Sequence, residues 1–133
     1  MTLAETLREA LDSVPSVKLA VLFGSTVRGT SGRTSDVDIG VVGVSADGLS
    51  QVEADLSRAV GRPVDLVALE TAPPLLRFEI ARDGAVVIER VPHAWSDFRA
   101  RAMVDWWDWA PLARRFHHAA ARRLQEQVSR GPA

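Results

Sequence analysis

Two aspartates, Asp36 and Asp38, stand two residues apart at the start of an apolar segment that ends at Val42. In a β-strand, residues two apart project to the same face, so both carboxylates are expected to point the same way. Carboxylate oxygens are the ligands that hard divalent cations such as Mg²⁺ prefer. The pair therefore predicts a metal site at the beginning of a strand; the alternative is a solvated strand end that binds no metal.

A Gly-Ser turn, Gly24 and Ser25, precedes this pair by ten residues and follows another apolar segment, residues 17–23. Unpaired backbone N–H groups in such a turn can hold phosphate oxygens. Arg28 is expected one turn into a short helix that follows, where it could reach the same phosphates. The alternative for Arg28, and for Arg33 in the next loop, is a solvated surface charge. A phosphate-binding turn beside a metal site predicts chemistry on a metal-bound phosphate chain.

A third acidic residue, Asp65, lies in the middle of the apolar run at residues 63–69. A carboxylate inside a buried strand is costly unless it is paired, hydrogen-bonded or bound to a metal. The pattern therefore indicates a functional role for Asp65. The alternative is a solvent-facing position on an edge strand.

The hydrophobic pattern divides the rest of the chain into alternating helices and strands, which predicts an α/β (α+β) fold. Runs of strand length occur at residues 17–23, 36–42, 63–69 and 85–91, and helical spacing of apolar residues occurs at 3–14, 49–60, 73–83 and 93–129. Thr2 and Glu5 have the spacing of a capping box at the start of the first helix.

From His93 on, apolar residues recur at helical spacing as far as Leu124. Residues 93–129 are therefore expected to form a helical extension that packs on a core at residues 1–92 and is kinked or split at Pro111. Residues 130–133 are expected to be a frayed tail. Trp106 and Trp109 lie on the apolar stripe and are expected in the core, whereas Trp107 lies off it and could anchor a partner contact.

The spacing of the site residues resembles that of a known superfamily. Gly24 and Ser25, ten intervening residues, then Asp36 and Asp38 form a GS-x10-D-x-D pattern, which is similar to the motif of the nucleotidyltransferases. The local sequence GSTVRG…SDVDIGVV resembles their smallest branch, the minimal nucleotidyltransferase (MNT) domains, and LLRFEIARDGAVVIER resembles the segment that closes such a domain. The resemblance implies a DNA polymerase beta-like fold, with a small mixed sheet of about four strands flanked by helices.

The resemblance also implies roles for the acids in transferring a nucleoside monophosphate from a triphosphate to a hydroxyl. Two Mg²⁺ ions, with Mn²⁺ as the alternative, would hold the reacting oxygens. Asp36 and Asp38 would bridge both metals, and Asp65 would bind the catalytic metal and accept the proton.

The nucleotide-binding set that the resemblance implies comprises the Gly-Ser turn and two further polar residues. The turn and Arg28 would bind the phosphates of ATP, and Ser35 would cap or orient the loop before the first acid. The nucleotide-binding residues are therefore expected to be Gly24, Ser25, Arg28 and Ser35.

Many MNT domains are antitoxins paired with a HEPN-domain ribonuclease toxin. The resemblance thus implies adenylylation of a toxin tyrosine, which would neutralise the toxin. Two alternatives remain: a non-catalytic antitoxin that acts by binding, and a nucleotidyltransferase that acts on a small molecule such as an aminoglycoside. The three acids favour catalysis, and a chain of this size has little left over to enclose a small acceptor.

Composition limits the class of protein further. The 133 residues suit one domain, and the formal net charge of -1 gives no electrostatic reason to expect direct nucleic-acid binding. The chain has no cysteine, so disulfides and thiolate metal sites are excluded. No signal peptide and no membrane-spanning run is seen. We expect a cytoplasmic protein without membrane contact, which could form an oligomer with itself or with the toxin.

Overall fold

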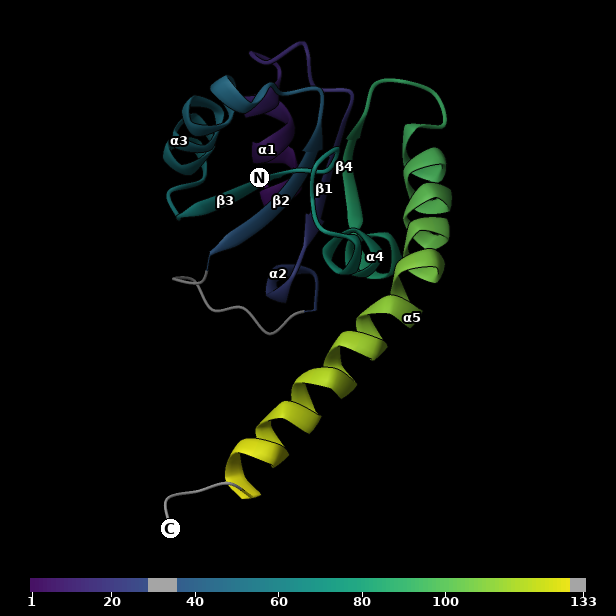
Figure 1. Cartoon of the computed structure of the whole chain (residues 1–133). Coiled ribbons are helices and arrows are strands. Elements are labelled where there is room, and N and C mark those ends of the chain that lie inside the picture. Colours follow the sequence, from purple (N-terminus) through teal and green to yellow (C-terminus); the bar gives the residue numbers. More distant parts are fainter. Residues whose placement is uncertain (29–35, 130–133) are drawn as a thin grey trace.

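The computed structural model of the chain describes residues 1–28 and 36–129, and beyond Leu112 it describes only the side chain of Arg115. Arg33, Ser35 and the expected tail therefore lie outside the described residues. The elements are α1 (Leu3–Leu11), β1 (Leu19–Phe23), α2 (Ser25–Arg28), β2 (Val37–Val42), η1 (Ala46–Gly48), α3 (Leu49–Val60), β3 (Val64–Ala68), α4 (Pro74–Asp83), β4 (Ala85–Glu89) and α5 (Ala94–Ser129) (Figure 1).

Local sequence signals account for several helix ends. The Thr2 hydroxyl accepts a hydrogen bond from the Glu5 N–H at 3.2 Å, which confirms the expected cap of α1. Helix α3 ends at Gly61, whose φ of 75° is the left-handed conformation that glycine adopts without strain. Helix α4 begins at Pro74, where a missing N–H has no cost.

The four strands form one mixed sheet, as the resemblance implied, and they lie in the order β3-β2-β1-β4. Strand β1 pairs antiparallel with β2 and with β4, whereas β2 and β3 are parallel. The carboxyl end of β1 and the amino ends of β2 and β3 therefore meet at the same edge of the sheet. The Gly-Ser turn follows β1 here, Asp36 and Asp38 lie at the start of β2, and Asp65 is the second residue of β3.

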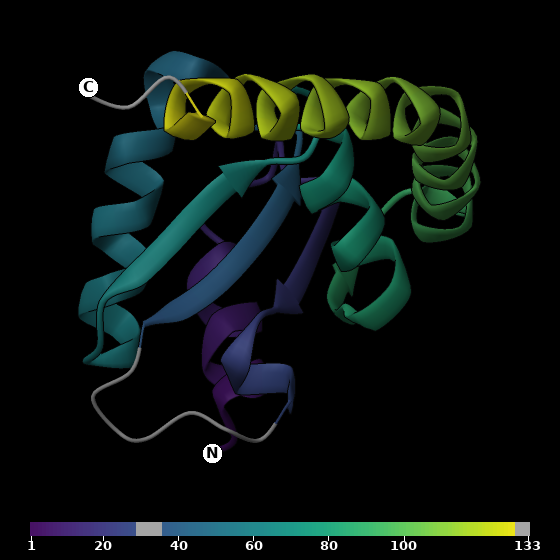
Figure 2. The same ribbon diagram turned by 60° about the horizontal axis from the view of Figure 1, so that its bottom comes forward.

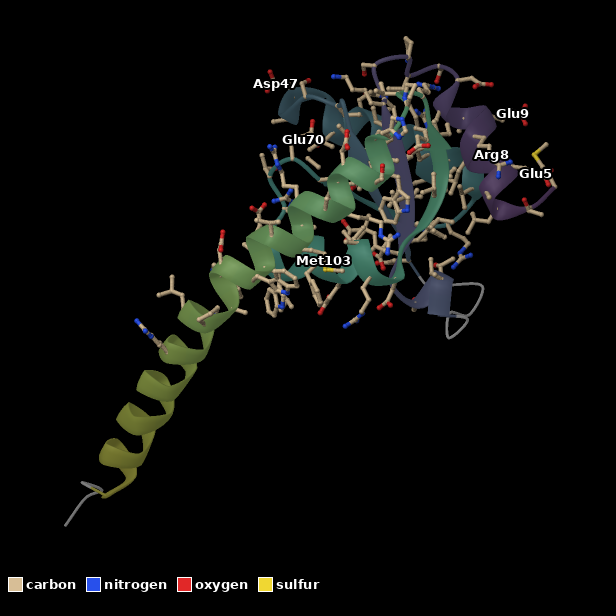
Figure 3. The ribbon with its side chains drawn as sticks, turned by 90° about the vertical axis from the view of Figure 1, so that its right-hand side faces the viewer. Glu5, Arg8, Glu9, Asp47, Glu70 and Met103 are labelled. Carbon is tan, nitrogen blue, oxygen red and sulfur yellow. The ribbon has the colours of Figure 1, made fainter. Side chains whose placement is uncertain are left out.

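Helices cover both faces of the sheet, and Figures 2 and 3 show α1 and α5 on opposite sides of it. One core lies between the sheet and helices α1 and α3, and includes Val37, Ile39 and Leu56. The second lies under α4 and α5, and includes Val21, Ile80 and Phe98. Each face is thus closed by its own helix pair.

Five hydrogen bonds between side chains and the backbone hold β3 to α3 and the end of α1 to the sheet. The outer N–H groups of edge strand β3 are satisfied by α3, since Val64 donates to Ser57 Oγ at 3.0 Å and Leu66 donates to Glu53 Oε2 at 2.9 Å. This blocks pairing with another strand at that edge. After β4, the Arg90 guanidinium donates to three backbone carbonyls, those of Leu11 (2.8 Å), Val14 (2.7 Å) and Val17 (3.1 Å), which ties the end of α1 to the sheet.

Helix α5 packs on α4 and β4 with its first turns only, and its carboxyl-terminal part projects beyond the body (Figures 1 and 3). It is one helix with Pro111 inside it, so the proline does not split it; Figure 1 shows its axis changing direction part-way along. None of the described helices is both long and apolar enough to cross a membrane.

The tryptophans of α5 fall into three environments. Trp106 is half-buried and stacks on Phe78 at 5.1 Å. Trp109 was expected in the core, but it is 36% exposed, because α5 is already leaving the body at this turn. Trp107 is 71% exposed, which confirms that it points away from the packed stripe.

Candidate active site

Strand register brings two of the three predicted acids side by side. Phe23 of β1 pairs with Asp38 of β2, and Asp38 pairs with Asp65 of β3, so the three residues form one row across the sheet. Neighbouring strands lie about 4.8 Å apart, and paired residues share a face. Since Val37 and Ile39 point into the α1/α3 core, this row lies on the face that α4 and α5 cover.

The environments of the acids differ from the sequence expectation in one respect. Asp38 is half-buried, and Asp36, one residue before β2, is exposed. Asp65 was expected to be buried, but it is exposed, because β3 is the edge strand and helices α4 and α5 pack mainly on β1 and β4. The expectation that Asp65 is buried, and therefore functional, was wrong. Its place beside Asp38 is now the observation that makes it a candidate.

The Gly-Ser turn lies directly against the Asp38 carboxylate. A Cβ at Gly24 would overlap Asp38 Oδ2 and would lie 3.3 Å from Asp38 Cγ. Gly24 also has a φ of 75°, which a residue with a side chain adopts only with strain. Both observations require glycine here. Helix α2 starts at the next residue, Ser25, which is half-buried, and ends at Arg28.

Beside the turn is a pocket of about 180 Å³ that the sequence analysis did not anticipate. It is lined by Phe23, Gly24, Leu76, Glu79, Arg82 and Asp83. Its charged residues come from α4, which is more than fifty residues away along the chain, so no local pattern could have found them. The carboxylate of Asp83 raises the pKa of Arg82 above its ordinary value, because it accepts a hydrogen bond from the guanidinium, so Arg82 stays charged.

The donor set at this edge suits an ion that shares its ligands with a substrate. Among the side chains that the structure describes, no group of three or more His, Asp or Glu could hold a metal. Mg²⁺ is usually held by one or two carboxylates together with substrate phosphates, and not by a cage made wholly of protein. The Asp38 carboxylate, which lies against a turn that can hold phosphate, and the neighbouring Asp65 fit that requirement.

A sheet edge that joins a Gly-Ser turn to strand-end carboxylates defines the class of nucleotidyl-transferring proteins. The family described as "Polymerase beta, Nucleotidyltransferase" matches residues 5–93, which include every site residue named above. The chain belongs to this family.

Individual relatives agree with this assignment. The protein adenylyltransferase MntA of Shewanella oneidensis is 36% identical over 76 residues, which are 55% of this chain and 55% of the relative. The matched segment thus spans about half the length of that protein.

Solved structures show the same fold. A chain of a toxin–antitoxin crystal structure with AMP-PNP aligns with a TM-score of 0.80 at 22% identity, over 89% of this chain and 98% of that chain. A chain from the complex of the tri-AMPylated Shewanella oneidensis HEPN toxin with its MNT antitoxin aligns with a TM-score of 0.74 at 19% identity, over 90% and 96%.

Proposed function

We propose that this protein transfers AMP from ATP to a hydroxyl of a cognate HEPN-domain toxin, on a tyrosine, and thereby neutralises the toxin. The observation that carries the proposal is the contact between the Gly24 turn and the Asp38 carboxylate, with Asp65 in register beside it. Membership of the nucleotidyltransferase family and the identity to a protein adenylyltransferase support the same reaction.

Each site residue then has a role that its position allows. Asp36, Asp38 and Asp65 would hold Mg²⁺, or Mn²⁺ in its place, which supplies charge neutralisation for the triphosphate and the leaving pyrophosphate. Asp65 accepts the proton of the attacking hydroxyl. Its exposure suits an acceptor that belongs to another protein, because a side chain of a docked partner can reach it without entering a closed pocket.

The Gly-Ser turn and the residues around it bind the nucleotide. Backbone N–H groups at Gly24 and Ser25 bind phosphate oxygens, and Arg28 at the end of α2 adds a cation. Ser35, which lies outside the described residues, remains a predicted member of this set. ATP as the substrate places the reaction in the cytoplasm.

Helix α5 is the part of the chain that we assign to partner binding. Three apolar residues of α5 are exposed: Val104 (55%), Trp107 (71%) and Leu112 (48%). Val104 and Trp107 are three residues apart, so their side chains are neighbours on the helix. Tryptophan is enriched among the residues that contribute most to protein interfaces, and Trp107 is the most exposed of the three. We place the HEPN toxin on this surface; a second copy of the chain is the alternative occupant.

The test is intact-mass spectrometry of the toxin after incubation with this protein, ATP and Mg²⁺. Wild type is compared with the Asp36→Ala/Asp38→Ala variant. A mass increase in units of AMP that the double variant cannot produce is the expected result. A stable complex without any mass change would instead support an antitoxin that acts by binding. If the toxin forms no complex and gains no mass, small molecules with a hydroxyl group become the candidate acceptors.

A further inference from the structure

The pocket beside Gly24 places a guanidinium next to the predicted triphosphate site. Arg82 lies in the last turn of α4, and it lines the same 180 Å³ pocket as Gly24. Figures 1 and 2 both show α4 beside the end of β1 from which α2 begins. Gly24 thus lies against the Asp38 carboxylate and also lines the pocket of Arg82.

We propose that Arg82 is a second triphosphate-binding residue, which contacts the β- or γ-phosphate of the bound nucleotide. The inference rests on the proposed function, because it takes ATP as the ligand of the Gly-Ser turn. A triphosphate and the three carboxylates of the site together carry more negative charge than two Mg²⁺ ions neutralise, so a further cation beside the turn improves the charge balance. An arginine suits this task better than a lysine, since its planar fork can bind two phosphate oxygens.

The present contacts of Arg82 are those of a group that can change partner. Its Nε and Nη2 atoms both donate to one oxygen, Oδ2 of Asp83, at 3.0 and 2.8 Å. The guanidinium lies 5.7 Å from the centre of the Phe78 ring, which holds it near the pocket while its side chain stays 55% exposed.

The acidic neighbours of Arg82 disfavour phosphate binding at its guanidinium. This leads to a second prediction. Asp83 competes directly for the guanidinium, and Glu79 lines the same pocket. Removing the Asp83 charge should therefore strengthen triphosphate binding, whereas removing the Arg82 charge should weaken it. Opposite changes from two adjacent residues are not expected if Arg82 serves only the stability of α4.

Arg58 provides a matched control. It forms an ion pair with Asp55 on exposed helix α3, with 73% of its side chain exposed, so Arg58→Gln removes the same charge from a similar pair on another helix. Each variant is first tested for an unchanged thermal unfolding temperature, and then for binding by calorimetry in the presence of Mg²⁺. The ligands are ATP, inorganic tripolyphosphate and AMP, which lacks the β- and γ-phosphates.

We expect Arg82→Gln to weaken binding of ATP and of tripolyphosphate about five- to twentyfold, as for loss of a partly exposed charge-assisted contact. AMP binding should stay within about twofold, Arg82→Lys should recover part of the loss, and Asp83→Asn should strengthen ATP binding. Equal ATP affinities for Arg82→Gln and Arg58→Gln would overturn the inference while leaving the proposed function intact. An equal loss of AMP binding would overturn the assignment to the β- or γ-phosphate. If the wild type bound no ATP, the proposed function would fail together with this inference.

Discussion

Replacing Gly24 by alanine would place a methyl group where the Asp38 carboxylate now lies. The added Cβ would overlap Asp38 Oδ2 and lie 3.3 Å from Cγ and 3.5 Å from Cβ of the same side chain. The Asp38 carboxylate would have to move by the order of an ångström. A displacement of that size in a reacting group can reduce the rate about a hundredfold. We therefore expect AMP transfer to fall by roughly two orders of magnitude.

The Gly61→Ala variant is a control that distinguishes the effect of moving the Asp38 carboxylate from the effect of backbone strain alone. Gly61 has the same φ of 75°, but an added Cβ would meet no atom within 4 Å. Alanine in the left-handed conformation costs roughly 1–2 kcal/mol at either position. For a chain of 133 residues, that loss corresponds to a fall of roughly 3–10 °C in the unfolding temperature. Both variants should therefore lose similar stability, and only Gly24→Ala should lose activity.

The assay combines thermal unfolding with intact-mass measurement of the partner toxin, both at a temperature where each variant is folded. Activity of folded Gly24→Ala equal to that of Gly61→Ala would refute the reasoning. It would mean that the position of the Asp38 carboxylate relative to the turn does not matter for the reaction.

Three further predictions concern stability and binding. Asp65→Asn should leave the free energy of unfolding within about 0.5 kcal/mol, because Asp65 is exposed, yet AMP transfer should fall about a hundredfold or more; an active variant would remove Asp65 from the site. Arg90→Ala should lower the free energy of unfolding by about 1–3 kcal/mol in urea titrations, since three carbonyls lose their donor, with the transfer rate of the folded fraction unchanged. Trp107→Ala should weaken the toxin complex about tenfold or more without lowering stability, and Trp106→Ala should lower stability instead; the reverse pattern would move the partner surface away from the exposed face of α5.

Much of this protein could be predicted from patterns that are local in the chain. These patterns depend on neighbours a few residues away. They include the apolar runs that form β1 and β2, the glycine and proline residues at the ends of elements, and the cap at Thr2. The spacing from Gly24 to Asp38 also lies within one turn-and-strand unit, so the sequence was enough to place the two together. These features follow from backbone geometry and from the hydrophobic period.

Tertiary structure decided what depends on contacts between distant segments. Whether Asp65 is buried depends on where β3 lies in the sheet, and its apolar neighbours could not reveal that it lies at the edge. The same holds for Trp109, which follows the apolar stripe of α5 past the point where the body ends. Arg82 lines the same pocket as Gly24 only because α4 packs beside β1. The exposure of a strand and the residues that line a pocket depend on which elements pack together. A single stretch of sequence does not show which distant element will pack against it.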